Sequence, residues 1–218
     1  MRGGFYFFLT TTTVLVSLIL PGPVRAQNTR IESFSKAKKL AAGLYTSRPQ
    51  TFYCACAFTG KAVDFAGCGY QPKSKSATAN RLEWEHVVPA ENFGRSFVEW
   101  REGHAECVDN NGKAFKGRNC ARKVSREFRR MEADLYNLMP ESADTNRQRS
   151  NYAPGMVPGE ARAYGACDIE IEGRTFEPRP DIRGDIARIY FYMDKAYPGR
   201  GIVSQQNRRL FEVWDKQD

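Results

Sequence analysis

The chain has 218 residues, of which 41% are hydrophobic, 12% aromatic and 27% charged. This composition excludes a disordered chain, and the length predicts one domain, or at most two small ones, with a sizeable core. The formal net charge of +8 is compatible with a polyanionic partner such as nucleic acid, although many exported proteins are also basic.

The first 26 residues are typical of a secretory signal peptide. One arginine precedes an apolar run over residues 5–20, and Val24 and Ala26 fit the small-residue rule for cleavage before Gln27. The alternative is a membrane anchor, but a run of about 16 residues is short against the ~20 that span a bilayer. Cleavage would remove two arginines and no acid, which lowers the net charge from +8 to +6. We therefore expect an exported, soluble protein of residues 27–218.

The cysteines support an oxidising compartment. An even number of cysteines predicts three disulfides, whereas a zinc site is disfavoured because there is no C-x-x-C spacing and only two histidines are present. A local Cys107–Cys120 bridge is expected across a Gly/Asn-rich loop. Cys54 and Cys56 are too close to pair with each other, so one is expected to meet Cys68 and the other Cys167, in either order.

One helix and several short strands are predicted in the first part of the mature chain. Ser33 should cap a helix from Phe34 to about Tyr45. Residues 51–58 and 62–65 read as strands, and residues 71–81 read as a polar, basic loop. The expected buried face of the helix consists of Phe34, Ala37, Leu40, Ala41 and Leu44.

The tract over residues 82–90 carries the strongest local chemical signal. It places Glu85 beside His86, and a carboxylate is a hard ligand for a divalent cation, while a neutral imidazole can take a proton from water. Neighbouring side chains on a strand point to opposite faces, so a pair that serves one site needs a strand end, which Pro89 favours. The alternative is a half-buried strand with an incidental polar pair.

Helices dominate the predictions for the second half, after a Gly/Asn-rich region that extends to residue 122. Residues 125–138 have helical periodicity, with Pro140 ending the helix, and residues 141–158 read as an extended loop. Two more helices are expected, one over about 185–197 and one capped by Ser204. Short strands with these helices predict an α+β fold. The expected core residues of the helices are Phe128, Met131, Leu135, Leu138, Ile186, Ile189, Tyr190, Met193, Leu210, Phe211 and Trp214.

Asn137 provides a second chemical signal, because it lies off the apolar stripe at the end of the predicted 125–138 helix. An amide oxygen is a neutral, hard donor, and with one glutamate it would hold Mg²⁺ while leaving most positions to water and substrate oxygens. The alternative is a capping residue at the helix end. Only a fold that brings Asn137 close to Glu85 and His86 makes it a ligand.

Several separated motifs are spread along the mature chain: Glu-Trp-Glu-His-Val-Val-Pro-Ala at 83–90, Phe93-Gly94, Asn119-Cys120, Met-Glu-Ala-Asp-Leu-x-Asn-Leu at 131–138, and the segment 183–193. Together, in this order, they resemble the bacterial endonuclease I family. The resemblance covers roughly residues 33–216. It implies a single mixed α+β domain, built around a ββα-metal (His-Me) finger and stapled by disulfides, in a periplasmic or secreted nonspecific nuclease. Such an enzyme would act on double- and single-stranded DNA and on RNA, bound through the phosphate backbone, as a monomer.

The resemblance also implies roles for individual residues. His86 matches the general base, and Glu85 and Asn137 match the two protein ligands of a single Mg²⁺, with Mn²⁺ or Ca²⁺ as alternatives. Attack by water would leave a 5′-phosphate. Arg118 matches an arginine that grips the phosphate, the alternative being a surface arginine. Glu132 would orient a metal-bound water, the alternative being a helix ion pair with Arg126 or Arg129.

Residues without an assigned role are also expected in the substrate groove. They are Asn146, Arg149 and Asn151, from the resemblance, and Lys73, Lys75 and the arginines between 118 and 130, whose charges would hold backbone phosphates. Two other functions remain open: a noncatalytic, disulfide-stapled protein that binds polyanions, and a metal-dependent phosphodiesterase for small substrates.

Overall fold

Helices and short strands alternate along the part of the chain that a computed structural model describes, which is residue 1, residues 27–159 and residues 161–217. Residues 2–26 of the expected signal peptide lie outside it. The first half contains α1 (Phe34–Leu44), β1 (Phe58–Thr59), β2 (Ala62–Val63), α2 (Phe65–Cys68), β3 (Leu82–His86), α3 (Ala90–Gly94) and α4 (Val98–Arg101). The second half contains α5 (Arg118–Val124), α6 (Arg126–Glu132), the 3₁₀ turn η1 (Leu135–Asn137), β4 (Leu138–Ser142), α7 (Ala143–Arg149), β5 (Ala153–Pro154), β6 (Glu170–Glu172), β7 (Thr175–Glu177), the 3₁₀ turn η2 (Pro180–Ile182), α8 (Arg183–Ala196) and α9 (Gln205–Trp214).

The predicted α+β class is confirmed, and its centre is a ββα unit. Strands β3 and β4 pair antiparallel, with Glu85 opposite Met139 and His86 opposite Leu138. Helix α7 follows β4 directly and packs against both strands. Segments about 50 residues apart in the sequence therefore meet at the carboxyl end of β3, where Glu85 and His86 lie.

Two small sheets flank this unit. Strands β1 and β2 form a hairpin whose turn contains Gly60 at φ +60°, a conformation that glycine adopts without steric cost. In the other sheet the order is β5-β7-β6, with β5 parallel and β6 antiparallel to β7.

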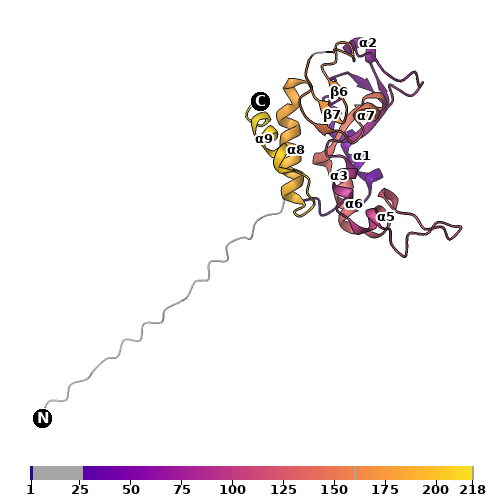
Figure 1. Cartoon of the computed structure of the whole chain (residues 1–218), viewed down its shortest axis with the longest axis vertical. Helices are drawn as coiled ribbons and strands as arrows, with labels where there is room; N and C mark the ends of the chain where they lie inside the picture. Colours follow the sequence, from indigo (N-terminus) through magenta and orange to yellow (C-terminus); the bar gives the residue numbers. More distant parts are fainter. Residues whose placement is uncertain (2–26, 160, 218) are drawn as a thin grey trace.

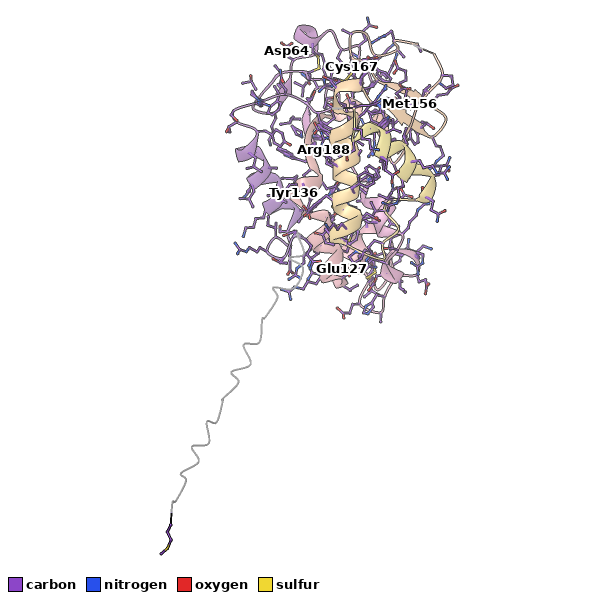
Figure 2. All side chains as sticks on the ribbon, turned by 90° about the vertical axis from the view of Figure 1, so that its left-hand side faces the viewer. Asp64, Glu127, Tyr136, Met156, Cys167 and Arg188 are labelled. Atoms are coloured by element: carbon purple, nitrogen blue, oxygen red, sulfur yellow. A yellow bond between two sulfur atoms is a disulfide. The ribbon has the colours of Figure 1, made fainter. Side chains whose placement is uncertain are left out.

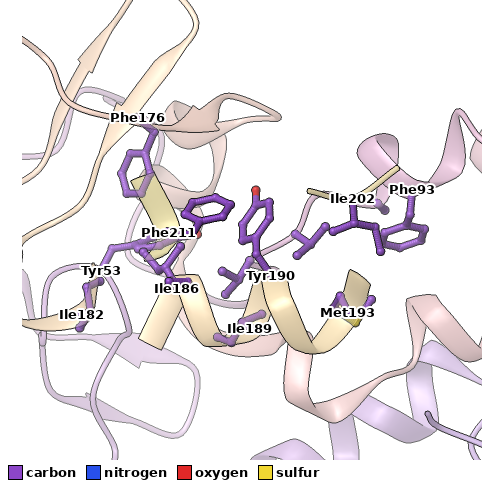
Figure 3. Close-up of a cluster of buried hydrophobic side chains, with 14 of the residues drawn as sticks. Tyr53, Phe93, Phe176, Ile182, Ile186, Ile189, Tyr190, Met193, Ile202 and Phe211 are labelled. Atoms are coloured by element: carbon purple, nitrogen blue, oxygen red, sulfur yellow. The ribbon is translucent and has the colours of Figure 1, made fainter. Parts of the chain in front are cut away.

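The main hydrophobic core lies under α8 and α9, which run side by side (Figure 1). Both helices match the predictions, including the Ser204 cap, whose side chain accepts from the backbone of Asn207. Figure 3 shows Ile186, Tyr190 and Met193 along the inner stripe of α8. In Figure 2 helix α8 runs vertically through the middle of the molecule, with Tyr136 beside it. Among the described residues, no helix has the length and apolar character needed to cross a membrane.

Three disulfides staple this fold, as predicted. They join Cys107 to Cys120, Cys56 to Cys68 and Cys54 to Cys167, which decides the order that the spacing left open. Cys56–Cys68 closes the short β1–β2–α2 region, whereas Cys54–Cys167 spans 113 residues. The turn containing Cys54 and Cys56 is thus attached both to the nearby helix α2 and to a segment more than a hundred residues further along the chain.

Several predicted elements are wrong. Residues 51–56 form turns rather than a strand, because the Thr51 hydroxyl accepts from the backbone of Cys56 and Ala55 has φ +53°. The apolar face of α1 buries Ala37 and Ala41 but leaves Leu40 and Leu44 exposed, at 43% and 64%.

The predicted 125–138 helix is also shorter than expected. Helix α6 ends at Glu132, since the carboxylate of Asp134 accepts from the backbone of Tyr136 and starts η1 instead. Pro140 then lies within β4 rather than at a helix end. The predicted loop over 141–158 contains α7, capped by the Ser142 hydroxyl, and the Gly/Asn-rich region contains α3, α4 and most of α5.

Candidate active site in a basic cleft

A cavity of about 1230 Å³ opens between α1, the β1–β2 turn, β3, α3, α5 and α7. Basic residues outnumber acidic ones in its wall. The charged and polar lining residues include Lys38, Lys39, Lys61, Arg81, Arg118, Arg149, Glu83, Glu85, Glu91, His86, Asn146 and Asn151. Glu85 and His86 both line this cleft, because they are the last two residues of β3 and the strand ends there.

His86 is held in one tautomer by a single contact. Its Nε2 lies 2.8 Å from the backbone carbonyl oxygen of Glu132, at the end of α6. A carbonyl oxygen only accepts, so Nε2 carries the hydrogen and Nδ1 is the unprotonated nitrogen of the neutral ring. Burial, followed by the positive charge of Arg118, lowers the pKa of His86 to about 4. The imidazole is therefore neutral near pH 7, with an unprotonated Nδ1.

Glu85 is a buried carboxylate with two donors on one oxygen. Its Oε1 accepts from the Tyr53 hydroxyl at 3.0 Å and from Arg149 Nη1 at 2.9 Å. Burial raises the pKa of Glu85 to about 6, although Arg149 and Tyr53 both oppose this rise. Arg149 also donates to the carbonyl oxygens of His86 and Val87. Arg149 thus lines the cleft, and its hydrogen bonds fix the end of the strand that carries Glu85 and His86.

Arg118 and Glu132 form a second polar group beside the imidazole. Glu132 is 1% exposed and accepts from Arg118 Nε at 2.6 Å and from Arg122 at 2.6 and 2.7 Å. Among the described residues, the buried Nη2 of Arg118 has no hydrogen-bond partner. The Glu132 carboxylate therefore orients arginines of α5, whereas the alternative expected for it, a helix ion pair with Arg126 or Arg129, is not formed among the described residues. Arg126 and Arg129 pair with Glu32 instead.

Asn137 does not line the cleft. It is fully buried, its Oδ1 accepts from the backbone nitrogen of Val88 at 2.7 Å, and its Nδ2 donates to the Val88 carbonyl at 3.0 Å. Both ends of the amide are therefore used to fix the chain immediately after His86. This position corrects the prediction that Asn137 is a metal ligand.

Asn146, which the family resemblance assigns to the substrate groove without a role, lies in a segment whose sequence predicts a loop. It is on α7 and lines the cleft, and its Nδ2 donates to Oε2 of Glu83 at 3.0 Å. The amide oxygen, which is the atom that binds cations, is not the one used in this bond. The spacing of Asn146 and Arg149, three residues apart, is the sequence signal for one helix face. This signal has no weight in the sequence alone, because residues 141–158 read as an extended loop rather than a helix.

The donor atoms of the cleft suit a hard divalent cation. Glu83, Glu85 and Asn146 offer carboxylate and amide oxygens, the ligands that Mg²⁺ and Ca²⁺ prefer. Within the described ranges, no group of three or more His, Cys, Asp or Glu side chains has a metal-site arrangement. A cation here would therefore have few protein ligands, and Mg²⁺ usually keeps several water molecules in its coordination shell.

The remaining expected groove residues divide into two sets. Asn151 lines the cleft and donates to Glu91 at 2.7 Å. Lys73 and Lys75 are outside the cleft wall, on a loop held to α7, because the backbone nitrogens of Lys73 and Ser74 donate to the Asp144 carboxylate.

Known proteins resemble this chain over nearly its whole length. The sequence model of the family described as Endonuclease I matches residues 26–217. A periplasmic deoxyribonuclease of Aeromonas hydrophila is 38% identical over 209 residues, covering 93% of this chain and 81% of the relative. An extracellular deoxyribonuclease of the same species is 37% identical over 217 residues, covering 96% and 86%. Endonuclease-1 of Buchnera aphidicola subsp. Acyrthosiphon pisum is 33% identical over 193 residues, covering 85% and 70%.

Proposed function

The chain belongs to the endonuclease I family, and we propose that it is an exported endonuclease that hydrolyses DNA and RNA with one Mg²⁺ and a histidine general base. The observation that carries the proposal is His86, a buried, neutral imidazole in the wall of a basic cleft, with Nε2 committed to the Glu132 carbonyl. The similarity to periplasmic and extracellular deoxyribonucleases supports DNA as a substrate and export from the cytoplasm. Residues 1–26 would be the signal peptide.

His86 would take a proton from the attacking water. Its Nδ1 has a lone pair in the tautomer that the Glu132 carbonyl selects, and the low pKa keeps the ring unprotonated before the reaction. As the water oxygen bonds to phosphorus, one of its protons passes to Nδ1 and the bond to the 3′ oxygen breaks, and the 3′ oxygen takes a proton from solvent. The products are a 5′-phosphate and a 3′-hydroxyl, and the imidazole returns its proton to solvent.

Glu85 and Asn146 would hold the cation, with Asn146 replacing the ligand first expected at position 137. Tyr53 and Arg149 fix the Glu85 carboxylate, and the α7 register places Asn146 in the same cleft wall. When bound, Mg²⁺ would neutralise negative charge on the scissile phosphate and stabilise the leaving oxygen. Mn²⁺ and Ca²⁺ have similar oxygen preferences and are the alternatives.

Arg118 would grip the phosphate through its guanidinium, whose Nη2 has no hydrogen-bond partner in the described part of the chain, while Glu132 holds its Nε. Lys38, Lys39 and Lys61 along the cleft would bind neighbouring phosphates. Contacts of this kind read charge rather than bases, so they give affinity without sequence preference and apply equally to DNA and RNA. We propose that a monomer suffices, because the site is built within one chain.

The test is cleavage of supercoiled plasmid by oxidised protein of residues 27–218, with Mg²⁺ or with EDTA. His86→Ala should lose activity by orders of magnitude, while His104→Ala, at the other histidine of the chain, should retain it. Nicks that DNA ligase can reseal would establish 5′-phosphate and 3′-hydroxyl ends. Binding without cutting in Mg²⁺, Mn²⁺ or Ca²⁺ would instead favour the noncatalytic polyanion-binding protein, and preferential cleavage of a cyclic dinucleotide would favour the small-substrate phosphodiesterase.

A further inference from the structure

The first residue of α1 lies against the proposed general base. The ring of Phe34 is 5.0 Å from the His86 imidazole, centroid to centroid, at an interplanar angle of 31°. Phe93 contacts the same imidazole edge-on at 6.5 Å and is itself fully buried. The imidazole is therefore held by two phenyl rings in addition to the hydrogen bond from its Nε2.

Phe34 also contacts the cation beside the imidazole. The guanidinium carbon of Arg118 lies over its ring at 5.6 Å, and Lys38 Nζ lies over it at 4.8 Å. Cations within about 6 Å of an aromatic centroid are attracted by the electron-rich face. One side chain thus touches both the group proposed to take the proton and the group proposed to bind the phosphate.

Phe34 lies outside the ββα unit, in α1, and the preceding segment Asn28–Ser33 holds it beside that unit. Asn28 donates from Nδ2 to the carbonyl of Arg130 at 2.9 Å and from its backbone to the Tyr197 hydroxyl at 3.1 Å. Glu32 forms ion pairs with Arg126, Arg129 and Arg130 of α6. The segment is therefore attached to the helix whose last residue, Glu132, binds His86.

A small hydrophobic cluster completes this attachment. Its buried members are Ala37, Ala133 and Leu138, and the partly buried residues around them are Ile31, Phe34 and Leu135. Phe34 is thus fixed from its own helix, from the end of α6 and from β4, which leaves the ring little freedom to move away from His86.

We propose that Phe34, held by the segment Asn28–Ser33, is a positioning residue that fixes His86 and Arg118 relative to each other during phosphodiester cleavage. This inference rests on the proposed function. Its physical basis is that a displacement of about 1 Å in a reacting group can reduce turnover by as much as about 100-fold, whereas binding of a long polyanion depends on many contacts. Loss of the Phe34 ring should therefore lower kcat more than it raises KM for DNA.

The first experiment compares kcat and KM for Phe34→Ala, Phe34→Tyr and Leu135→Ala. Leu135 packs in the same small cluster, whereas the described ring contacts of His86 are with Phe34 and Phe93. Phe34→Ala should lower kcat about 10- to 100-fold with KM changed less than about 3-fold, and Phe34→Tyr should restore most of it. Leu135→Ala should lower the melting temperature but leave kcat within about 2-fold. Equal loss of kcat in both alanine variants, or no loss in Phe34→Ala, would overturn the proposal.

A substrate without bases separates positioning from base stacking. Bis(p-nitrophenyl) phosphate offers a phosphodiester but no nucleobase, so a positioning role predicts the same fold-loss of kcat as on DNA. If Phe34→Ala were impaired on DNA alone, Phe34 would be a stacking platform for a nucleobase and the positioning role would be wrong.

A measurement without substrate distinguishes failure of this inference from failure of the proposed function. In the oxidised protein the Nε2–H of His86, bonded to the Glu132 carbonyl, should give a slowly exchanging imidazole resonance, assigned with the help of His104→Gln. In Phe34→Ala it should broaden or exchange at least about 10-fold faster, and Phe34→Tyr should restore it. An unchanged resonance would contradict the positioning role even if the wild-type enzyme is fully active.

Discussion

Nε2 of His86 donates to the backbone carbonyl oxygen of Glu132, 46 residues away in the sequence, over 2.8 Å. The carbonyl belongs to the last residue of α6, and the carboxylate of the same residue holds Arg118 from α5. Glu132 therefore organises two proposed functional groups with different atoms: its main chain selects the imidazole tautomer, and its side chain orients the guanidinium. Substitutions of the Glu132 side chain should affect only the second of these.

Glu132→Gln should weaken the grip of Arg118 while leaving the His86 tautomer unchanged. The amide loses the charge that holds two arginines, so we expect kcat/KM to fall about 10- to 100-fold. Glu127→Gln on the same helix, whose partner is Arg200 at the surface, is the matched control and should change activity less than about 2-fold. Plasmid cleavage rates with melting temperatures measured in parallel would check this. Equal activity of the two variants would contradict the assigned role.

Replacing Asn146 and Asn137 by alanine, one at a time, distinguishes a proposed cation ligand from a structural residue. Asn146→Ala should lose activity at least about 100-fold with little change in stability, because Asn146 is half-buried and its loss frees only one hydrogen bond with Glu83. Asn137→Ala should lower the free energy of unfolding by about 2–4 kcal/mol, because it leaves the buried backbone N–H and C=O of Val88 without hydrogen-bond partners. Urea unfolding with cleavage assays measures both. A stable, inactive Asn137→Ala with an active Asn146→Ala would return the ligand role to Asn137.

Tyr53→Phe should weaken cation binding more than it changes turnover at saturating cation. The phenol donates to Glu85 Oε1 from a fully buried position, so its removal loosens a proposed ligand without touching the cleft wall. We expect the Mg²⁺ concentration for half-maximal activity to rise about 10-fold. Tyr197→Phe, which removes a buried phenol from Asp134 instead, should leave that concentration unchanged. A shift of equal size in both variants would show a general loss of stability rather than an effect on Glu85.

His86 should make the cation-free protein less stable in mild acid. Burial lowers the pKa of His86 to about 4, whereas an unfolded histidine titrates near 6.5. Below pH 6.5 the unfolded state binds a proton that the folded state does not, so stability falls as pH falls from 6.5 towards 4, by at most roughly 3 kcal/mol. In EDTA, His86→Gln should remove this slope. Unfolding free energies at about pH 5 and about pH 7 would test it, and parallel pH profiles for the two proteins would count against it.

The comparison with wild type is needed because two carboxyl groups act in the opposite direction. Burial raises the pKa of Glu85 to about 6 and that of Glu141 to about 7. The unfolded state releases these protons first, so their contribution to stability falls as pH rises through the same range. Both groups are present in wild type and in His86→Gln, and the difference between the two proteins isolates the histidine.

Local patterns in the sequence were sufficient for features that neighbouring residues determine. The apolar stripe of α8, the serine caps of α1 and α9, the Cys107–Cys120 bridge and the Glu85-His86 strand end all depend on spacings of a few residues, and the structure contains each of them. Hydrophobic periodicity and capping act through contacts within one or two helical turns, so they can be predicted from the sequence without knowledge of the fold.

The tertiary structure decided which distant groups meet at the site. Helical periodicity extended the predicted 125–138 helix too far, because the buried positions of β4 continue the apolar pattern while the Asp134 side chain ends the helix. The predicted helix therefore ends near Asn137, and the predicted loop that follows it includes Asn146. In the structure, β3 pairs with β4, and this pairing buries Asn137 against Val88. Helix α7 follows β4, so Asn146 lines the cleft. The contacts of Tyr53 with Glu85 and of Phe34 with His86 likewise join segments 32 and more residues apart, and only packing of the whole chain brings them together.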